Sequence, residues 1–186
     1  MRIVAGQFKG RPIQAPKTDA TRPTSDRARE SLFNMIAHAA WAPPLYGARV
    51  MDLFAGSGAL GLEALSRGAS YCVFVETAHQ ALGVLRKNIS ALDVALATKI
   101  QRRSATDLGS LPPALGGRFD FAFMDPPYRK NLVEPCLESL LDGAWLAEDA
   151  LVVVETAVEE TSAFTGWELV SERPSGAAKF WFLKQA

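Results

Sequence analysis

The sequence has few cysteines, no net charge and no long apolar run, and each shortage excludes a class of protein. Only Cys72 and Cys136 occur in 186 residues, and their spacing matches no metal-binding or redox motif. We expect two buried, reduced thiols rather than a disulfide scaffold. No apolar run reaches the ~18 residues of a membrane span, and the first residues lack the apolar core of a signal peptide. We therefore expect a cytoplasmic protein with no membrane partner.

The charge is balanced over the whole chain but unevenly placed. Twenty basic residues match twenty acidic ones, which argues against a protein that coats nucleic acid through bulk electrostatics. Residues 1–30 nevertheless hold seven basic and three acidic residues. This segment is a candidate contact for a polyanion, and from charge alone a solvated arm without a partner is an equally good interpretation. The basic residues are Arg2, Lys9, Arg11, Lys17, Arg22, Arg27 and Arg29.

What the chain does contain is an alternation of strand-like and helical patterns. A small hairpin or irregular arm is expected over residues 2–16, with Gly6 and Gly10 as turn residues. A helix should follow, capped by Thr24, Ser25 or Asp26 and stopped by Pro43-Pro44. Further strands are expected over 50–54, 71–76, 99–103, 119–125, 151–155, 167–173 and 179–183, and further helices over 60–66, 78–92 and 132–141.

This alternation predicts an α/β fold with a parallel sheet covered on both faces. Only residues 174–178 separate the last two strands, which leaves no room for a crossover helix, so this pair must be antiparallel. We expect a seven-stranded, mostly parallel, Rossmann-like sheet that ends in an antiparallel hairpin. A small N-terminal β-hairpin and helix extension, residues 1–40, would pack on the main domain, residues 41–186.

Residues 50–61 place an acidic side chain in a strand and glycines at the turn into a helix. Gly56 and Gly58 would let the backbone approach a ligand, and in an open α/β sheet this turn lies at the ligand-binding edge. Glu76 ends the next strand, where a carboxylate can accept hydrogen bonds from both ribose hydroxyls. The pattern predicts an adenosine pocket.

The spacing of Gly56, Gly58 and Gly61 also satisfies the dinucleotide fingerprint, so an NAD oxidoreductase is a competing interpretation. Asp52 favours S-adenosylmethionine, because its carboxylate can bind the ammonium of the amino acid part but would lie unfavourably close to a pyrophosphate. A loop after the third strand is expected to meet the adenine edge, with Asp107 as a further candidate. The expected cofactor-binding residues are Asp52, Phe54, Gly56, Gly58, Glu76, Ser104 and Ala105.

The fourth strand runs directly into Asp125-Pro126-Pro127-Tyr128, the most specific signal in the chain. Two prolines cannot extend the sheet, so they hold a fixed turn beside the glycines. Asp125 and the Pro126 carbonyl can accept the hydrogens of a base's exocyclic amine, which localises the nitrogen lone pair for attack on a sulfonium methyl. Tyr128 offers a flat face for an extruded base. The pattern predicts methyl transfer to such an amine, with these four residues catalytic.

Four segments together resemble the RsmD family of bacterial 16S ribosomal RNA guanine-N2 methyltransferases. They are Arg2-Ile3-Val4-Ala5-Gly6 with Lys9-Gly10-Arg11; Thr21-Arg22-Pro23-Thr24-Ser25-Asp26-Arg27 with Arg29-Glu30-Ser31-Leu32-Phe33-Asn34; Asp52-Leu53-Phe54-Ala55-Gly56-Ser57-Gly58-Ala59-Leu60-Gly61; and Asp125-Pro126-Pro127-Tyr128. The last is shared with adenine and glutamine amide methyltransferases, whereas the two N-terminal segments are far more selective. Where this chain has Ser104, the family more often has Asp or Asn.

The resemblance implies a class I methyltransferase fold, S-adenosylmethionine as cofactor and one guanine of 16S rRNA, guanine 966, as the target. The substrate would be the 30S subunit or a late precursor of it. A monomer without a metal is expected. The basic arm becomes the expected RNA contact, through Lys9, Arg11, Arg22, Thr24 and Arg27.

Two further functions stay open. An adenine-N6 DNA methyltransferase would use the same tetrapeptide, although 186 residues leave no room for a separate DNA-recognition domain. A protein that binds RNA through a methyltransferase fold without turnover is disfavoured by the intact Asp125 and glycine turn.

Overall fold

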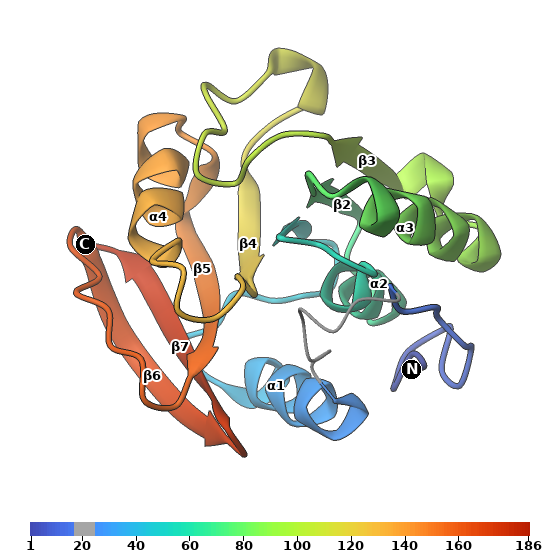
Figure 1. Ribbon diagram of the computed structural model, residues 1–186, viewed down its shortest axis with the longest axis horizontal. Helices are drawn as coiled ribbons and strands as arrows, with labels where there is room; N and C mark the ends of the chain where they lie inside the picture. Colours follow the sequence, from blue (N-terminus) through green and yellow to red (C-terminus); the bar gives the residue numbers. More distant parts are fainter. Residues whose placement is uncertain (17–24) are drawn as a thin grey trace.

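The computed structural model describes residues 1–16 and 25–186, and in them a seven-stranded sheet carries helices on both faces (Figure 1). The strand order is β3-β2-β1-β4-β5-β7-β6. The strands are β1 (Arg49–Leu53), β2 (Tyr71–Val75), β3 (Thr98–Gln101), β4 (Phe119–Met124), β5 (Leu146–Ala157), β6 (Trp167–Ser175) and β7 (Ala178–Gln185). The helices are α1 (Asp26–His38), α2 (Ala59–Ser66), α3 (His79–Leu92) and α4 (Val133–Asp142), with short 3-10 turns at Ala95–Ala97 and Pro113–Leu115.

The directions of the strands confirm the predicted α/β fold. Strands β1 to β5 pair in parallel, whereas β7 is antiparallel to both β5 and β6. The link between β6 and β7 is shorter than expected, because only Gly176 and Ala177 lie outside the two strands, and Gly176 takes the positive φ of +64° that such a tight turn needs. Pro174, which cannot donate to a ladder, lies on β6 at the edge of the sheet.

Alternate residues of each central strand serve two separate cores. Val50, Cys72, Phe74, Phe121 and Phe123 point to the face covered by α1, α2 and α3. The residues between them join α4 and the loop before β4 on the opposite face. Burial on both sides explains why these strands are almost continuously apolar, which is typical of parallel sheets.

Helix α1 starts at one of its three expected caps. The Ser25 hydroxyl accepts a hydrogen bond from the Ala28 amide at 3.1 Å, while Thr24 lies outside the described residues. The helix ends at His38 rather than at the prolines, because Ala39 already has extended backbone angles. Its buried side chains include Leu32, Phe33 and Ile36, which join the core above the sheet.

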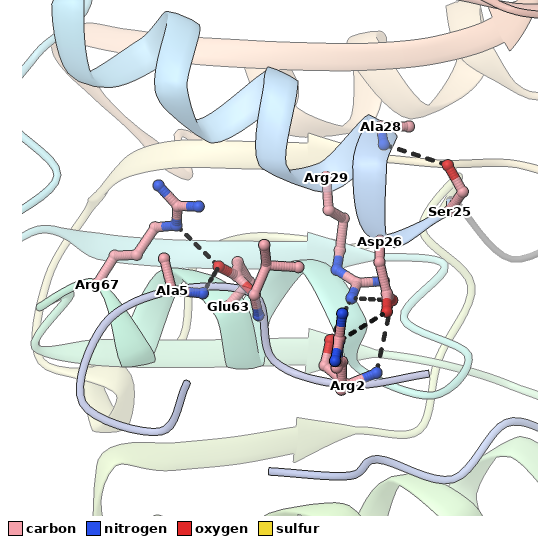
Figure 2. Close-up of polar contacts among 9 residues, drawn as sticks. Arg2, Ala5, Ser25, Asp26, Ala28, Arg29, Glu63 and Arg67 are labelled. Atoms are coloured by element: carbon pink, nitrogen blue, oxygen red, sulfur yellow. Dashed lines mark hydrogen bonds and ion pairs between the residues drawn. The ribbon is translucent and has the colours of Figure 1, made fainter. Parts of the chain in front are cut away.

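The N-terminal segment is an irregular arm that docks on α2. It holds one isolated bridge, Arg2 to Pro12, and no extended hairpin in residues 1–16. A Cβ at Gly6 would lie 1.9 Å from the Ser66 carbonyl oxygen, so only glycine allows this approach. The second anchor is the buried Glu63 carboxylate, which accepts hydrogen bonds from the Val4 and Ala5 amides, at 2.8 and 3.0 Å, and from the Arg67 guanidinium. Figure 2 shows its bonds with Ala5 and Arg67.

A third anchor joins the arm to α1. Arg29 is fully buried, and its guanidinium donates to the Arg2 carbonyl and to the Asp26 carboxylate (Figure 2). Arg29 is therefore a structural residue, although it counts among the basic residues of the N-terminal segment. The positive charge available to a polyanion is smaller than the sequence suggests.

Cys72 and Cys136 are both buried and free, as predicted. None of the helices in the described residues is long and apolar enough to cross a membrane.

Gly61 should be needed for the packing of α2 on β2. An added Cβ would lie 2.5 Å from Phe74 Cε1 and 2.6 Å from Cys72 Sγ. We expect Gly61→Ala to lower the free energy of unfolding by about 1–3 kcal/mol through overpacking. Urea denaturation measures this. Gly83→Ala is the control, because a Cβ there meets nothing within 4 Å and should stabilise α3 by about 0.5–1 kcal/mol. Equal effects of the two substitutions would contradict the packing argument.

Candidate functional site

The candidate site lies at the carboxyl edge of the sheet, where the strand order reverses. Strand β1 pairs in parallel with β2 on one side and with β4 on the other, so the segments that follow these three strands leave from the same edge. Open α/β sheets bind their ligands at such a switch point. The glycine loop (residues 54–58), Glu76 and the proline corner (residues 125–128) are brought together there.

The glycine loop contains three residues with positive φ: Phe54 at +62°, Gly56 at +54° and Gly58 at +81°. A Cβ on Gly56 would face open space, with its nearest neighbour 3.9 Å away, so this backbone is accessible to a ligand. A Cβ on Gly58 would instead lie 2.5 Å from Leu85 Cδ1, on α3. Of the two glycines singled out for ligand approach, Gly58 is thus constrained by packing inside the protein.

Glu76 is held in one orientation by three backbone amides. Its Oε2 accepts a hydrogen bond from Gly56 at 2.8 Å, and its Oε1 accepts from Thr77 at 2.7 Å and Ala78 at 2.8 Å. A carboxylate offers about four lone-pair sites, so with three of them occupied Glu76 keeps one, on Oε2, for a hydroxyl of a ligand. The direct bond between Glu76 and Gly56 brings the two sequence motifs into contact.

Asp52 lies in β1, two residues before the glycine loop, and is almost completely buried, with 2% of its surface exposed. Its Oδ2 accepts a hydrogen bond from the Gly61 amide at 2.9 Å. Burial raises the pKa of Asp52 to about 8; the Gly61 bond opposes this shift and the negative charge of Glu76 adds to it. A cation placed against Asp52 would favour the ionised carboxylate, so the residue suits a ligand that carries an ammonium group.

Ser104 and Ala105 follow β3 at the same edge of the sheet. Ala105 is buried, whereas Ser104 is exposed and its hydroxyl lies 2.7 Å from that of Thr106. The Asp107 amide donates to the Ser104 carbonyl at 3.2 Å, which closes this segment into a turn. The contact of Ser104 and Ala105 with adenine stays a prediction.

The proline corner turns sharply after β4. Pro126 is buried, and the Tyr128 hydroxyl donates to Oε1 of Glu155 at 3.0 Å. Glu155 lies in β5 and is only 5% exposed. Burial, followed by the negative charge of Glu155, raises the pKa of Tyr128 well above its ordinary value, so this hydroxyl stays protonated. The bond ties the hydroxyl of Tyr128 to β5, while the residue stays 37% exposed.

A cavity of about 470 Å³ opens beside Tyr128 and Glu155. Its other walls are the start of α1, with Arg27, and the turn between β6 and β7. Such a cavity lies in the usual range for small-molecule sites, about 300–1,000 Å³. It combines a ring face, a carboxylate and a guanidinium in a space large enough for one nucleotide.

The predicted RNA contacts fall on different segments. Arg27 lines the cavity, whereas Lys9 and Arg11 are exposed on the turn of the arm. The Arg11 guanidinium donates to the Ala91 carbonyl at the end of α3. Arg22 and Thr24 lie outside the described residues.

Three buried polar residues that hold Tyr128, the arm or the glycine loop in place could not be singled out from the sequence: Glu155, Glu63 and Asn88. Each is a buried polar side chain within an otherwise apolar stretch. A charge or amide at an apolar position of a helix or strand is the signal that could have identified them, because such groups are rarely buried without polar partners.

Comparisons with known proteins agree with this geometry. Residues 1–184 match the family described as Conserved hypothetical protein 95. Ribosomal RNA small subunit methyltransferase D of Escherichia coli (strain K12) is 36% identical over 182 residues, which are 97% of this chain and 87% of that protein. The protein of the same name from Haemophilus influenzae is 33% identical over 97% of this chain and 91% of its own length.

Solved structures show the same likeness. The structure of yhhF from Escherichia coli superposes with a TM-score of 0.80 at 35% identity and covers 100% of this chain and 97% of that one. Hypothetical protein TTHA0928 of Thermus thermophilus gives a TM-score of 0.76 at 27% identity, covering 100% and 99%.

The raised pKa of Asp52 predicts how stability depends on pH. Because the pKa is about 8 when folded and ordinarily 3.8, the folded protein keeps a proton that the unfolded chain loses between these values. The free energy of unfolding should therefore fall as pH rises from about 5 to 8. In Asp52→Asn this decline should be much shallower. Urea denaturation at a series of pH values measures it, and identical slopes would contradict the assignment.

Proposed function

The chain belongs to the RsmD family of ribosomal RNA methyltransferases, and we propose that it transfers a methyl group from S-adenosylmethionine to the N2 amine of one guanine in 16S rRNA. The observation that carries the proposal is the meeting of the proline corner with the glycine loop and Glu76 at one switch point. This arrangement lets a methyl donor at the glycine loop face an amine held at the proline corner.

The residues at the glycine loop fit S-adenosylmethionine. The Glu76 carboxylate is oriented by three amides and keeps one acceptor site for a ribose hydroxyl, and the open space at Gly56 leaves room for the ligand. The Asp52 carboxylate would bind the ammonium of the amino acid part directly or through a water. When bound, S-adenosylmethionine supplies a methyl group on an electrophilic sulfonium. Ser104 and Ala105 would lie against the edge of the adenine.

The proline corner would activate the amine. The lone pair of guanine N2 is delocalised into the ring, so it becomes a good nucleophile only when acceptors draw on the amine hydrogens. Asp125 and the Pro126 carbonyl are those acceptors, and the departing proton goes to Asp125 or to water. Correct alignment of the reacting groups can supply roughly 7–11 kcal/mol, so no covalent enzyme intermediate is needed.

The cavity beside Tyr128 is the proposed site of the extruded base. Stacking of a base on an aromatic ring contributes about 1–3 kcal/mol, and Tyr128 is held for this purpose by Glu155. Arg27, on the opposite wall, would contact a phosphate of the flipped nucleotide. Lys9, Arg11, Arg22 and Thr24 would extend this contact along the RNA.

By the same proposal the enzyme acts as a monomer in the cytoplasm, without a metal. Its target is guanine 966, presented by the 30S subunit or a late precursor. The neutral overall charge fits a substrate recognised by shape and local contacts rather than by bulk attraction.

Asp125→Ala tests the proposed chemistry. In cells that lack the gene, the wild type should restore one N2-methylguanine in 16S rRNA, mapped by mass spectrometry. The variant should reduce that methylation about 100-fold or more, the usual scale for loss of one polar group that stabilises the transition state. It should still bind S-adenosylmethionine by calorimetry. Asp142→Ala, at the end of α4 and away from the proline corner, is the control and should restore methylation.

Further outcomes of this experiment decide between functions. Comparable turnover by Asp125→Ala would refute the role of that residue. A methylated adenine missing from the cells, rather than a guanine, would refute the N2 assignment. Binding without any methylation by the wild type would favour a protein that binds RNA without turnover.

Arg22→Ala combined with Arg27→Ala tests the RNA contact. If each arginine meets one phosphate, the slope of log affinity for 30S subunits against log salt should fall by about two. Filter binding at several salt concentrations measures this slope. Arg118→Ala, an exposed arginine just before β4 and so at the opposite edge of the sheet, should leave it unchanged. An unaltered slope in the double variant would exclude these residues as phosphate contacts.

A further inference from the structure

Asn88 is a buried amide at a position where α3 should be apolar. Helical spacing places it one turn from Leu85 and from Leu92, and both of these are buried against the sheet. Asn88 itself is only 2% exposed. A side chain that carries two N–H donors and one acceptor oxygen is costly to bury unless polar groups surround it.

Those partners come from two different parts of the molecule. Asn88 Oδ1 accepts a hydrogen bond from the Gln14 amide at 2.8 Å, and Nδ2 donates to the Gln14 carbonyl at 2.9 Å. Nδ2 also donates to the Ser57 carbonyl at 2.8 Å. Since an amide N–H only donates and a carbonyl only accepts, these partners define the orientation of the side chain. One amide therefore joins the N-terminal arm to the glycine loop.

The two segments that Asn88 joins are proposed to bind different ligands: RNA on the arm and S-adenosylmethionine on the glycine loop. Gln14 lies near the end of the arm, shortly before the segment that contains Arg22 and Thr24. Ser57 lies between Gly56, which bonds Glu76, and Gly58, which packs against Leu85 one turn earlier on α3. Helix α3 thus supports the glycine loop through Leu85 and holds the arm through Asn88.

We propose that Asn88 is a positioning residue that couples RNA binding on the arm to cofactor binding on the glycine loop. RNA bound to Lys9 and Arg11 would favour the docked position of the arm, and with it the bonds that Asn88 makes to the Gln14 backbone and to the Ser57 carbonyl. Each ligand therefore strengthens the binding of the other, and by linkage the two effects are equal. This inference rests on the proposed function, since it takes the two ligands from it.

The test measures the affinity for S-adenosylhomocysteine, which binds without turnover, by equilibrium dialysis. It is measured without and with saturating 30S subunits from cells that lack the enzyme. For the wild type we expect binding about fivefold tighter or more when the subunits are present, the lower end of typical coupling. For Asn88→Leu, which has a similar shape but no hydrogen bonds, the two affinities should be equal. Thermal melting establishes that the variant is folded.

Gln14→Pro removes only the amide bonded to Asn88 Oδ1 and leaves the bond to Ser57 in place. It should weaken the coupling without changing the affinity of the free enzyme for S-adenosylhomocysteine, an effect that general destabilisation would not produce. Gln14→Ala keeps both backbone bonds and should retain the coupling. Glu63→Gln disturbs the other end of the arm, which does not involve the glycine loop, and should also retain it.

The possible failures are distinguishable. A wild type that binds both ligands independently, or an Asn88→Leu variant with wild-type coupling, would overturn the role of Asn88 while the proposed function stands. A wild type that does not bind S-adenosylhomocysteine would overturn the proposed function and the coupling with it.

Discussion

The pairing of β1 with β2 on one side and β4 on the other is the constraint on which the site depends. Because all three strands run in parallel, the glycine loop, Glu76 and the proline corner must leave the sheet at one edge. The bond from the Gly56 amide to Glu76 then joins the first two across neighbouring strands. No single segment contains the site, so its geometry is a property of the sheet rather than of any motif.

Much of this arrangement follows from the sequence, because the motifs coincide with strong local signals. Glycine readily adopts the positive φ of a turn, and two prolines after a buried strand restrict the backbone, so the places of Gly56 and Pro126 were predictable. The alternation of apolar runs and helices was equally informative about the order of the elements. The short link between β6 and β7 required an antiparallel pair, which the structure contains.

What the sequence did not reveal depends on contacts between distant segments. Strand β5 begins at Leu146, before the apolar run that was expected to define it, because Leu146 pairs with Phe119 ahead of an irregularity in the ladder. Arg29 looked like a surface charge and is buried by the arm. Besides its positive φ, Gly58 is constrained by Leu85 on another helix. No local pattern reports such partners.

The outermost strand of the sheet has a consequence for how copies of the protein behave at high concentration. An exposed edge is a template onto which a strand of another molecule can add. On β6 this template is interrupted by Pro174, which offers no amide, and it is lined by the exposed charges of Glu168, Glu172 and Arg173. The hairpin that borders the cavity therefore also discourages aggregation through strand addition.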